Sequence, residues 1–217
     1  MELVNINERI KSEFDDEIIT KLADINLLDE YRNSSSTKQS IRVLENILEK
    51  NLIQQDIIKL IINDYILELV PAGTKGVIRG NKFNQIIKII IEDMKLDTEK
   101  FDVCFEKQCI GFETNEKPDW YIKSKGQNEK VLIGMNQLDL WNGGAQLNRG
   151  SKYILENKNT ENRKLLCVVC NKIEIKTEKS KAFKLFAKGF IDDTLCYPNN
   201  LANIIKKYFV ISNEEST

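Results

Sequence analysis

The chain has 217 residues, 41% of them hydrophobic and 30% charged, and its 32 basic and 33 acidic side chains leave a formal net charge of −1. This length suits one large domain or two small ones, with enough apolar residues for a hydrophobic core. Histidine is absent, which excludes Ser-His-Asp and Cys-His catalysis, HEXXH zinc sites and nucleases that bind metal through histidine.

The first 70 residues have the pattern of a helical region. Apolar residues recur at spacings of three and four, which predicts amphipathic helices from about residue 6 to 31 and from about 37 to 68. Residues 33–37, Asn-Ser-Ser-Ser-Thr, separate them with turn and N-cap chemistry. Pro71 to Gly76 then breaks the helical pattern, so we expect a helical N-terminal domain over residues 1–70.

The remaining residues, 71–217, have the pattern of a mixed α/β core. Helices are predicted at 81–94, 179–190 and 201–209, and a loop leading into a helix at 138–156. Strands are predicted at 101–106, 108–113, 118–123, 130–136 and 164–170. The last of these is continuously apolar, as in a strand buried on both faces. The order predicts a mixed β-sheet flanked by helices, with the helical region added at its N-terminal side.

The cysteines and apolar runs indicate a cytoplasmic protein. Five cysteines, an odd number in a lysine-rich chain, fit a reducing compartment. Cys167 and Cys170 form a C-x-x-C inside an apolar strand, so we interpret them as core thiols rather than a zinc or redox site. The start of the chain has no signal-peptide pattern, and no apolar run is long enough to span a membrane.

Charge is distributed unevenly along the chain. Residues 1–66 carry 8 basic and 13 acidic side chains, whereas residues 142–190 carry 11 basic and 4 acidic ones. The resulting net +7 of the second segment is compatible with a polyanion-binding surface, although lysine-rich surfaces are often only solvated.

The most informative polar residues stand at the ends of two predicted neighbouring strands. Pro118-Asp119 opens one strand, and Asn136-Gln137 closes the next after a tight hairpin. Adjacent strands lie about 5 Å apart, so these side chains can meet if the hairpin register allows it. An aspartate with a second oxygen ligand can hold Mg²⁺ for phosphodiester hydrolysis, a chemistry that needs no histidine. The alternative is plain turn chemistry at Asp119 and edge polarity at Asn136 and Gln137.

Three segments in this order resemble the PD-(D/E)xK nuclease superfamily, and within it type II restriction endonucleases. Gly80 to Asn84 is similar to the start of its first helix, Pro118-Asp119 to its first half-motif, and Met135-Asn136-Gln137 to its second. The resemblance covers about residues 76–170. It implies a restriction-endonuclease-like fold and Mg²⁺-dependent, site-specific hydrolysis of double-stranded DNA by a homodimer.

The resemblance also implies roles for individual residues. Asp119 is expected to bind the metal, and Asn136, Gln137 and Glu113 to complete the catalytic site, with Asn136 as a neutral oxygen ligand. Met135 stands where the superfamily has an acid, and Gln137 where it has lysine. Glu113 or Asn84 can supply the missing position from a neighbouring element, or Lys152 from the following helix.

The segment from residue 142 to 153 is a candidate DNA contact. It combines glycines, which lower helix stability and permit close backbone approach, with side chains that pair with base edges or phosphates. These side chains are Asn142, Gln146, Asn148, Arg149 and Lys152. The alternative is a polar connection in which Arg149 makes an internal ion pair.

Two other functions compete with the restriction endonuclease. The first is a catalytically degenerate nuclease fold that serves as a DNA-binding or protein-interaction module, which the missing acid and lysine favour. The second is a structure-selective nuclease such as a junction resolvase, which would prefer branched DNA.

Overall fold

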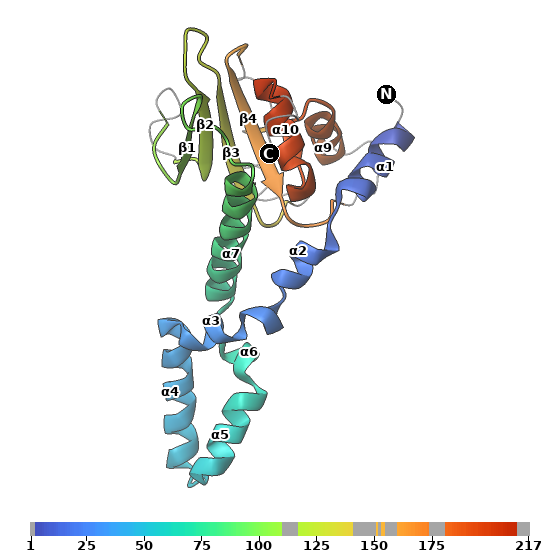
Figure 1. Ribbon diagram of the computed structural model, residues 1–217. Helices are drawn as coiled ribbons and strands as arrows, with labels where there is room; N and C mark the ends of the chain where they lie inside the picture. Colours follow the sequence, from blue (N-terminus) through green and yellow to red (C-terminus); the bar gives the residue numbers. More distant parts are fainter. Residues whose placement is uncertain are drawn as a thin grey trace. The chain divides into compact units, whose positions relative to one another are not determined.

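The computed structural model describes residues 3–109, 117–140, 151, 153–154, 160–173 and 181–211 (Figure 1). The helices are α1 Leu3–Glu13, α2 Asp16–Lys21, the 3-10 helix η1 Asp24–Leu27, α3 Leu28–Asn33, α4 Ser35–Lys50, α5 Gln55–Asp64, α6 Ile66–Leu69, α7 Ala72–Asp93, α9 Lys181–Ile191 and α10 Pro198–Phe209. The strands are β1 Phe101–Phe105, β2 Trp120–Ser124, β3 Val131–Gln137, β4 Arg163–Val169 and β5 Leu195–Cys196.

The chain divides into two compact units. The first, here the sheet unit, joins Met1–Asp16 to Phe83–Thr217, and the second, the helical unit, is Glu17–Lys82. Helix α7 contributes to both. Among the described residues, no helix is long and apolar enough to cross a membrane.

The sheet unit is built on five strands in the order β1-β2-β3-β4-β5. Strands β1, β2 and β3 form an antiparallel meander, and β4 and β5 continue it in parallel. The expected mixed α/β architecture is therefore confirmed, including the antiparallel hairpin between β2 and β3. Strand β5 was not predicted, because two residues are too few to show a period.

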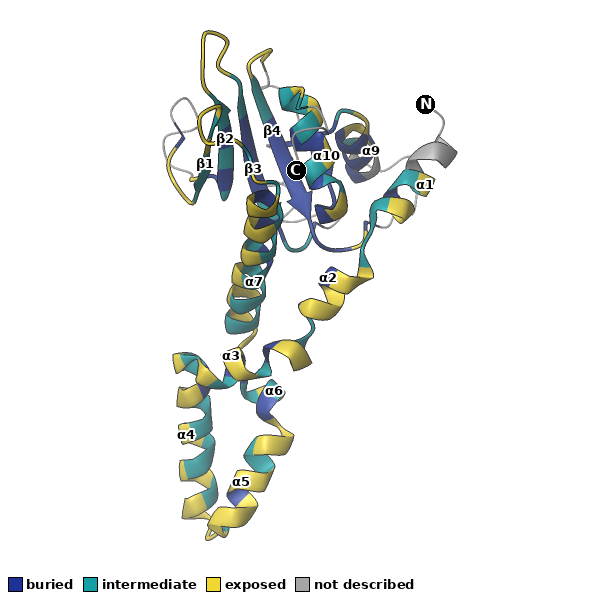
Figure 2. Cartoon of the chain, in the orientation of Figure 1, coloured by how far each residue is buried: buried dark blue, intermediate teal, exposed yellow. Residues whose placement is uncertain are grey.

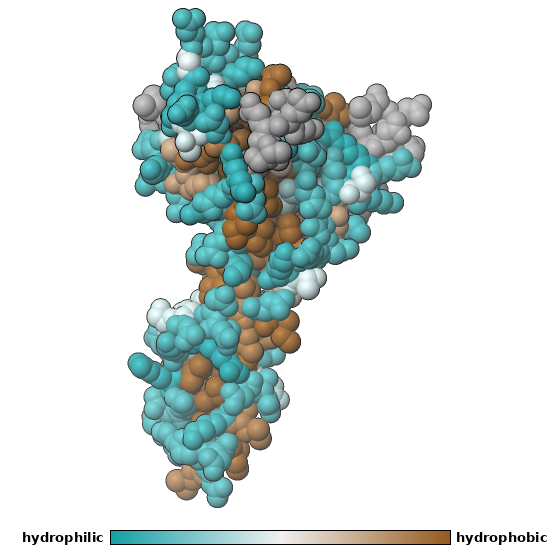
Figure 3. Space-filling view, viewed as in Figure 1, coloured by the Kyte–Doolittle hydropathy of each residue, from teal (hydrophilic) through white to brown (hydrophobic). Residues whose placement is uncertain are grey.

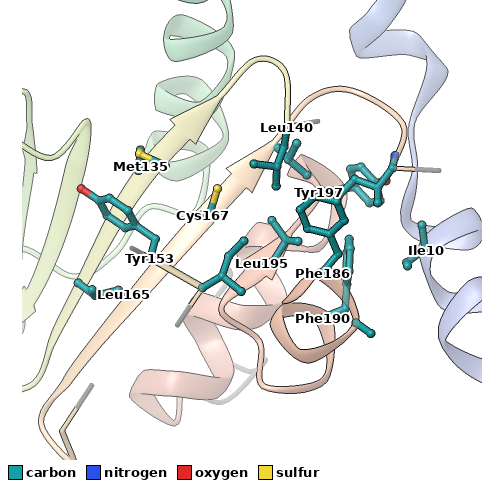
Figure 4. Close-up of a cluster of buried hydrophobic side chains, with 14 of the residues drawn as sticks. Ile10, Met135, Leu140, Tyr153, Leu165, Cys167, Phe186, Phe190, Leu195 and Tyr197 are labelled. Atoms are coloured by element: carbon teal, nitrogen blue, oxygen red, sulfur yellow. The ribbon is translucent and has the colours of Figure 1, made fainter. Parts of the chain in front are cut away.

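Helices cover both faces of this sheet. Lys88 of α7 lies over the ring of Phe105, and Phe209 of α10 contacts Phe101, so these two helices pack on one side, here the α7 face. The other side, the α9 face, holds a buried cluster to which β3, β4, α9 and α1 all contribute (Figure 4). Side chains alternate between the two faces along each strand.

The N-terminal helices are shorter than the sequence predicted. The helix expected over 6–31 is four separate pieces, α1, α2, η1 and α3, and the helix expected over 37–68 is α4, α5 and α6. The break after α4 occurs at Leu52, which has φ 60°, with Ile53 N–H bonded to Leu48 O and Leu52 N–H to Glu49 O. This is a Schellman ending, and a leucine at its left-handed position gives no turn signal in the sequence.

Helix α7 is longer than predicted. The sequence indicated a break at residues 71–76 and a helix from 81, but α7 begins at Ala72. Pro71 directly precedes the helix and its carbonyl accepts the Lys75 N–H, while Thr74 bonds Ser36 of α4 through their hydroxyls. Each glycine inside a helix costs about 1 kcal/mol relative to alanine, and α7 continues through Gly73, Gly76 and Gly80 despite this cost.

Predictions in the rest of the sheet unit are mostly confirmed. β1, β2, β3, β4, α9 and α10 each lie within about three residues of the predicted boundaries. For the strand predicted at 108–113, Gln108 and Cys109 are not in a strand and the rest lies outside the described residues. Cys167 and Cys170 are buried free thiols, as expected.

Candidate functional site

Asp119 lies at the end of the β2–β3 ladder, where β2 begins. Its backbone N–H donates to Gly134 O at 3.1 Å, and its backbone carbonyl accepts from Glu106 N–H at 2.9 Å. Its carboxylate oxygen Oδ2 accepts the backbone N–H of Asn136 at 2.6 Å. The side chain therefore continues the ladder by one bond, and the half-buried carboxylate is held against the last residues of β3.

Asn136 joins β3 to its neighbours through its side chain. Its Oδ1 accepts from the Trp120 indole Nε1–H at 3.0 Å, and its Nδ2 donates to Asn84 Oδ1 on α7 at 3.0 Å. Asn136 and Asn84 are half-buried, whereas Trp120 is buried. The carboxamides of Asn84 and Asn136 thus meet on the α7 face, and the Asp119 carboxylate binds the backbone N–H of Asn136.

Gly134 is required by the packing of Trp120. These two residues are register partners in the β2–β3 pair, and a Cβ on Gly134 would lie 1.9 Å from an atom of the indole ring. No side chain fits at position 134 while Trp120 keeps its place. Trp120 is buried and acts here as a packing residue. A glycine inside an apolar strand often marks a position where another group approaches the backbone closely. Gly134 was therefore the signal in the sequence for this contact.

The residues on either side of Asn136 belong to the opposite face. Met135 is 4% exposed and packs in the apolar cluster with Cys167 of β4 (Figure 4). Gln137, two residues on, shares the face of Met135 and donates its Nε2–H to Asp139 O at 2.9 Å. The structure therefore brings Asn136 and Asp119 together through the backbone, and it separates the side chains of Asn136 and Gln137.

The charge of Asp119 reaches the buried α9 face. Burial raises the pKa of the Cys167 thiol, and the negative charge of Asp119 raises it further. Cys167 is completely buried, so this thiol stays protonated at neutral pH and is not a nucleophile.

The other predicted site residues lie outside the described residues. These are Glu113 and the five candidate DNA contacts, Asn142, Gln146, Asn148, Arg149 and Lys152. Within the described ranges, no group of three or more acidic or cysteine side chains is placed to hold a metal ion.

A second polar cluster, which the sequence did not reveal, attaches α1 to the sheet unit. Asp193 Oδ1 lies 3.0 Å from Arg9 Nη2, and its Oδ2 lies 2.6 Å from Lys207 Nζ. Burial disfavours the charge of Asp193, but the bonds from Lys207 and Arg9 outweigh it and lower the pKa of the carboxyl group. The three residues are far apart in sequence, so their pairing has no local pattern.

Comparison of the chain with protein-family models, curated proteins and solved structures finds no match.

Proposed function

We propose that this chain is a Mg²⁺-dependent endonuclease of type II restriction character, which hydrolyses double-stranded DNA at specific sites as a homodimer. The observation that carries the proposal is the carboxylate of Asp119 at the start of β2, held by the Asn136 N–H beside the Asn84–Asn136 pair.

The order of elements supports this proposal. A helix that carries the Gly80-to-Asn84 segment is followed by an antiparallel β1-β2-β3 meander and then a parallel strand, β4. The Pro118-Asp119 half-motif is at the beginning of the middle strand, and the second half-motif is at the end of the third. This is the arrangement that the resemblance implies.

The donor set fits Mg²⁺ in part. Mg²⁺ prefers oxygen ligands and is often held by one or two carboxylates together with waters and substrate phosphates. Asp119 supplies the carboxylate, and the carboxamide oxygens of Asn136, whose N–H binds Asp119, and of its partner Asn84 are the neutral candidates. When bound, the metal would polarise the phosphodiester and stabilise the leaving oxygen. The Asn136 N–H fixes the orientation of the Asp119 carboxylate, and the Trp120–Asn136–Asn84 bonds hold the end of β3 against α7.

A second candidate is a DNA-binding module of the same fold without hydrolysis. Met135, in the position expected for the acid, is buried among apolar side chains, and Gly134 leaves no room for one on the α7 face. The second half-motif then supplies no carboxylate to accompany Asp119, and the bond from the Asn136 N–H to Asp119 serves the ladder alone.

Plasmid cleavage with an Asp119→Asn variant distinguishes the two. Asparagine keeps the shape of the side chain and an acceptor for the Asn136 N–H, so the fold is preserved while the charge is lost. Asp102→Asn is the matched control, because Asp102 is an exposed β1 residue paired with Lys125. Supercoiled plasmid with a range of sites is incubated with each protein and Mg²⁺ or Mn²⁺, and DNA binding is measured in Ca²⁺.

We expect discrete fragments from the wild type and the control, and a loss of about 100-fold or more in cleavage rate for Asp119→Asn with binding retained. Binding without cleavage by all three proteins would instead support the module. Equal cleavage by all three would remove Asp119 from the site, and absence of binding and cleavage would contradict both functions.

A further inference from the structure

Two reduced cysteines lie on the α9 face, at the edge of the sheet unit that β1 forms. Cys104 belongs to β1 and is the register partner of Tyr121 in β2, so their side chains share a face. Tyr121 packs against the buried apolar cluster of the α9 face, and Cys109 is a member of that cluster. Both cysteines therefore lie on one face with Tyr121, and neither belongs to the candidate nuclease site.

A turn after β1 returns the chain to this face. Glu106 N–H donates to Asp119 O at 2.9 Å, one residue beyond the β1–β2 ladder, and Glu106 has φ 52°. This left-handed conformation ends the strand and is unfavourable for a residue other than glycine. Cys109 follows three residues later and is 6% exposed. Only residues 105–108 separate the two cysteines, so a bond between them would close a short loop.

The charges and hydrogen bonds of this face place both thiols and Tyr121 in one cluster. A hydrogen bond with Cys104, burial and the proximity of both thiols raise the pKa of Tyr121 to about 12. Burial raises the pKa of the Cys109 thiol, and the positive charges of Arg163 and Lys123 act in the opposite direction. Cys109 is therefore protonated at neutral pH, yet two cations are placed to stabilise its thiolate when it forms.

The two thiols differ in their access to solvent. Cys104 is half-buried in an edge strand, and the polar residues that follow it, Glu106, Lys107 and Gln108, are exposed. Figure 2 shows β1 at intermediate exposure and β4 almost entirely buried, and Figure 3 shows mainly hydrophilic side chains at the β1 edge of the sheet unit. A small molecule in solution can therefore reach Cys104 first, with the buried Cys109 behind it.

We propose that Cys104 and Cys109 form a dithiol site that reacts with small-molecule disulfides, such as glutathione disulfide, and closes to an intramolecular disulfide. The Cys104 thiolate attacks one sulfur of the small disulfide, so that a mixed disulfide forms and one thiol leaves. The Cys109 thiolate then attacks the Cys104 sulfur and expels the second thiol. The two cysteines lose two electrons and two protons, and the small disulfide gains them as it becomes two thiols.

The inference goes beyond the proposed nuclease function and does not depend on it, because its test follows the mass of the protein and not cleavage. The new bond would nevertheless restrain the start of β2. The loop that it closes contains Glu106, whose N–H binds the backbone carbonyl of Asp119.

The folded full-length protein is incubated with glutathione disulfide, and its products are identified by intact mass and by peptide mapping after the remaining thiols are alkylated. We expect the wild type to lose two hydrogen atoms, with the new bond between Cys104 and Cys109, and dithiothreitol to reverse the change. Cys109→Ser should stop at the mixed disulfide, with one glutathione on Cys104. Cys104→Ser should react about 100-fold or more slowly, because the remaining thiols are less accessible.

Cys170→Ser is the matched control, since Cys170 is buried to the same extent as Cys109 (5% against 6% exposed) but lies at the end of β4. It should react as the wild type does, and circular dichroism checks that each variant is folded. A wild type that stays unmodified or stops at a stable mixed disulfide would overturn the inference. So would a disulfide mapped to another pair, or a Cys104→Ser variant that reacts as fast as Cys170→Ser.

Discussion

The last three residues of β3 face two environments, a polar network on the α7 face and an apolar cluster on the α9 face. Asn136 is bonded to Trp120 and Asn84, while Met135 packs with Cys167. These positions are adjacent in sequence, yet a shift of one residue in register would exchange their surroundings completely. This difference decides which side of the sheet can hold the polar side chains of a catalytic site.

The comparison bears directly on the proposed site. In an acid-x-Lys half-motif the two functional side chains share a face, because they are two residues apart in a strand. If the two positions of the half-motif are Met135 and Gln137, that face is the buried α9 face. If they are Gly134 and Asn136, it is the α7 face, which also holds Asn84. The second face holds the Asn84–Asn136 pair, whereas Asp119 binds the backbone N–H of Asn136 and acts electrostatically on Cys167 of the first face. Three substitutions in β3 test which face is used, and a fourth tests the Asp193 cluster; they are taken in decreasing order of expected effect.

Met135→Glu should have the largest effect, because it places a carboxyl group in the apolar cluster. Met135 is 4% exposed, and we expect the free energy of unfolding at pH 7 to fall by about 4 kcal/mol. Desolvation would raise the pKa of the new carboxyl group, so the loss should be smaller at pH 5 than at pH 8. Urea unfolding at both pH values measures this, with Met135→Leu as the control at under about 1.5 kcal/mol. A stable Met135→Glu variant that binds Mg²⁺ would place the site on the α9 face.

Gly134→Ala tests the packing that closes the α7 face to an acid. The new Cβ would overlap the Trp120 ring, which is buried and cannot move without disturbing the core. We expect a loss of about 3 kcal/mol in the free energy of unfolding. Gly80→Ala is the matched control, since nothing lies within 4 Å of its added Cβ, and it should be neutral or stabilise α7 by up to about 1 kcal/mol. Equal effects of the two substitutions would show that Trp120 does not cover Gly134.

The sequence predicted the strands better than it predicted their faces. The patterns of β1 to β4 were sufficient because apolar runs between turn residues mark strands wherever they pack. In β3, however, residues 132–135 are all buried, so no alternation shows which side Asn136 takes. That choice is made by Trp120 and Asn84, which are distant in sequence. Asp119 was predicted as a site residue from the Pro-Asp pair alone. Its bond to the Asn136 N–H, however, depends on the register of the hairpin.

Asp193→Asn tests the polar cluster in which Asp193 joins Arg9 of α1 to Lys207 of α10. The folded protein lowers the pKa of this carboxyl group below its unfolded value of about 4. The resulting stability is therefore present above about pH 4 and is lost as the pH falls through the folded pKa. Asp193→Asn should lower the free energy of unfolding at pH 7 by about 1–2 kcal/mol, and by less at pH 3. An equal loss at both pH values in urea titrations would show that the charge of Asp193 is not what stabilises the contact with Arg9 and Lys207.

Asn136→Asp should change stability least, by under about 1 kcal/mol, because an Oδ1 that accepts from Trp120 is retained and the Asn84 amide can turn to donate. It adds a carboxylate to the residue whose backbone N–H binds Asp119, and two neighbouring carboxylates repel each other until a cation binds between them. Mg²⁺ or Mn²⁺ should therefore raise the melting temperature of Asn136→Asp more than that of the wild type. Gln137→Glu adds the same charge one residue further on but on the α9 face, and should show no such response. If the metal stabilised Gln137→Glu instead, the hydrogen bonds among Asn84, Asn136 and Trp120 would have only a structural role, and the metal site would lie on the α9 face.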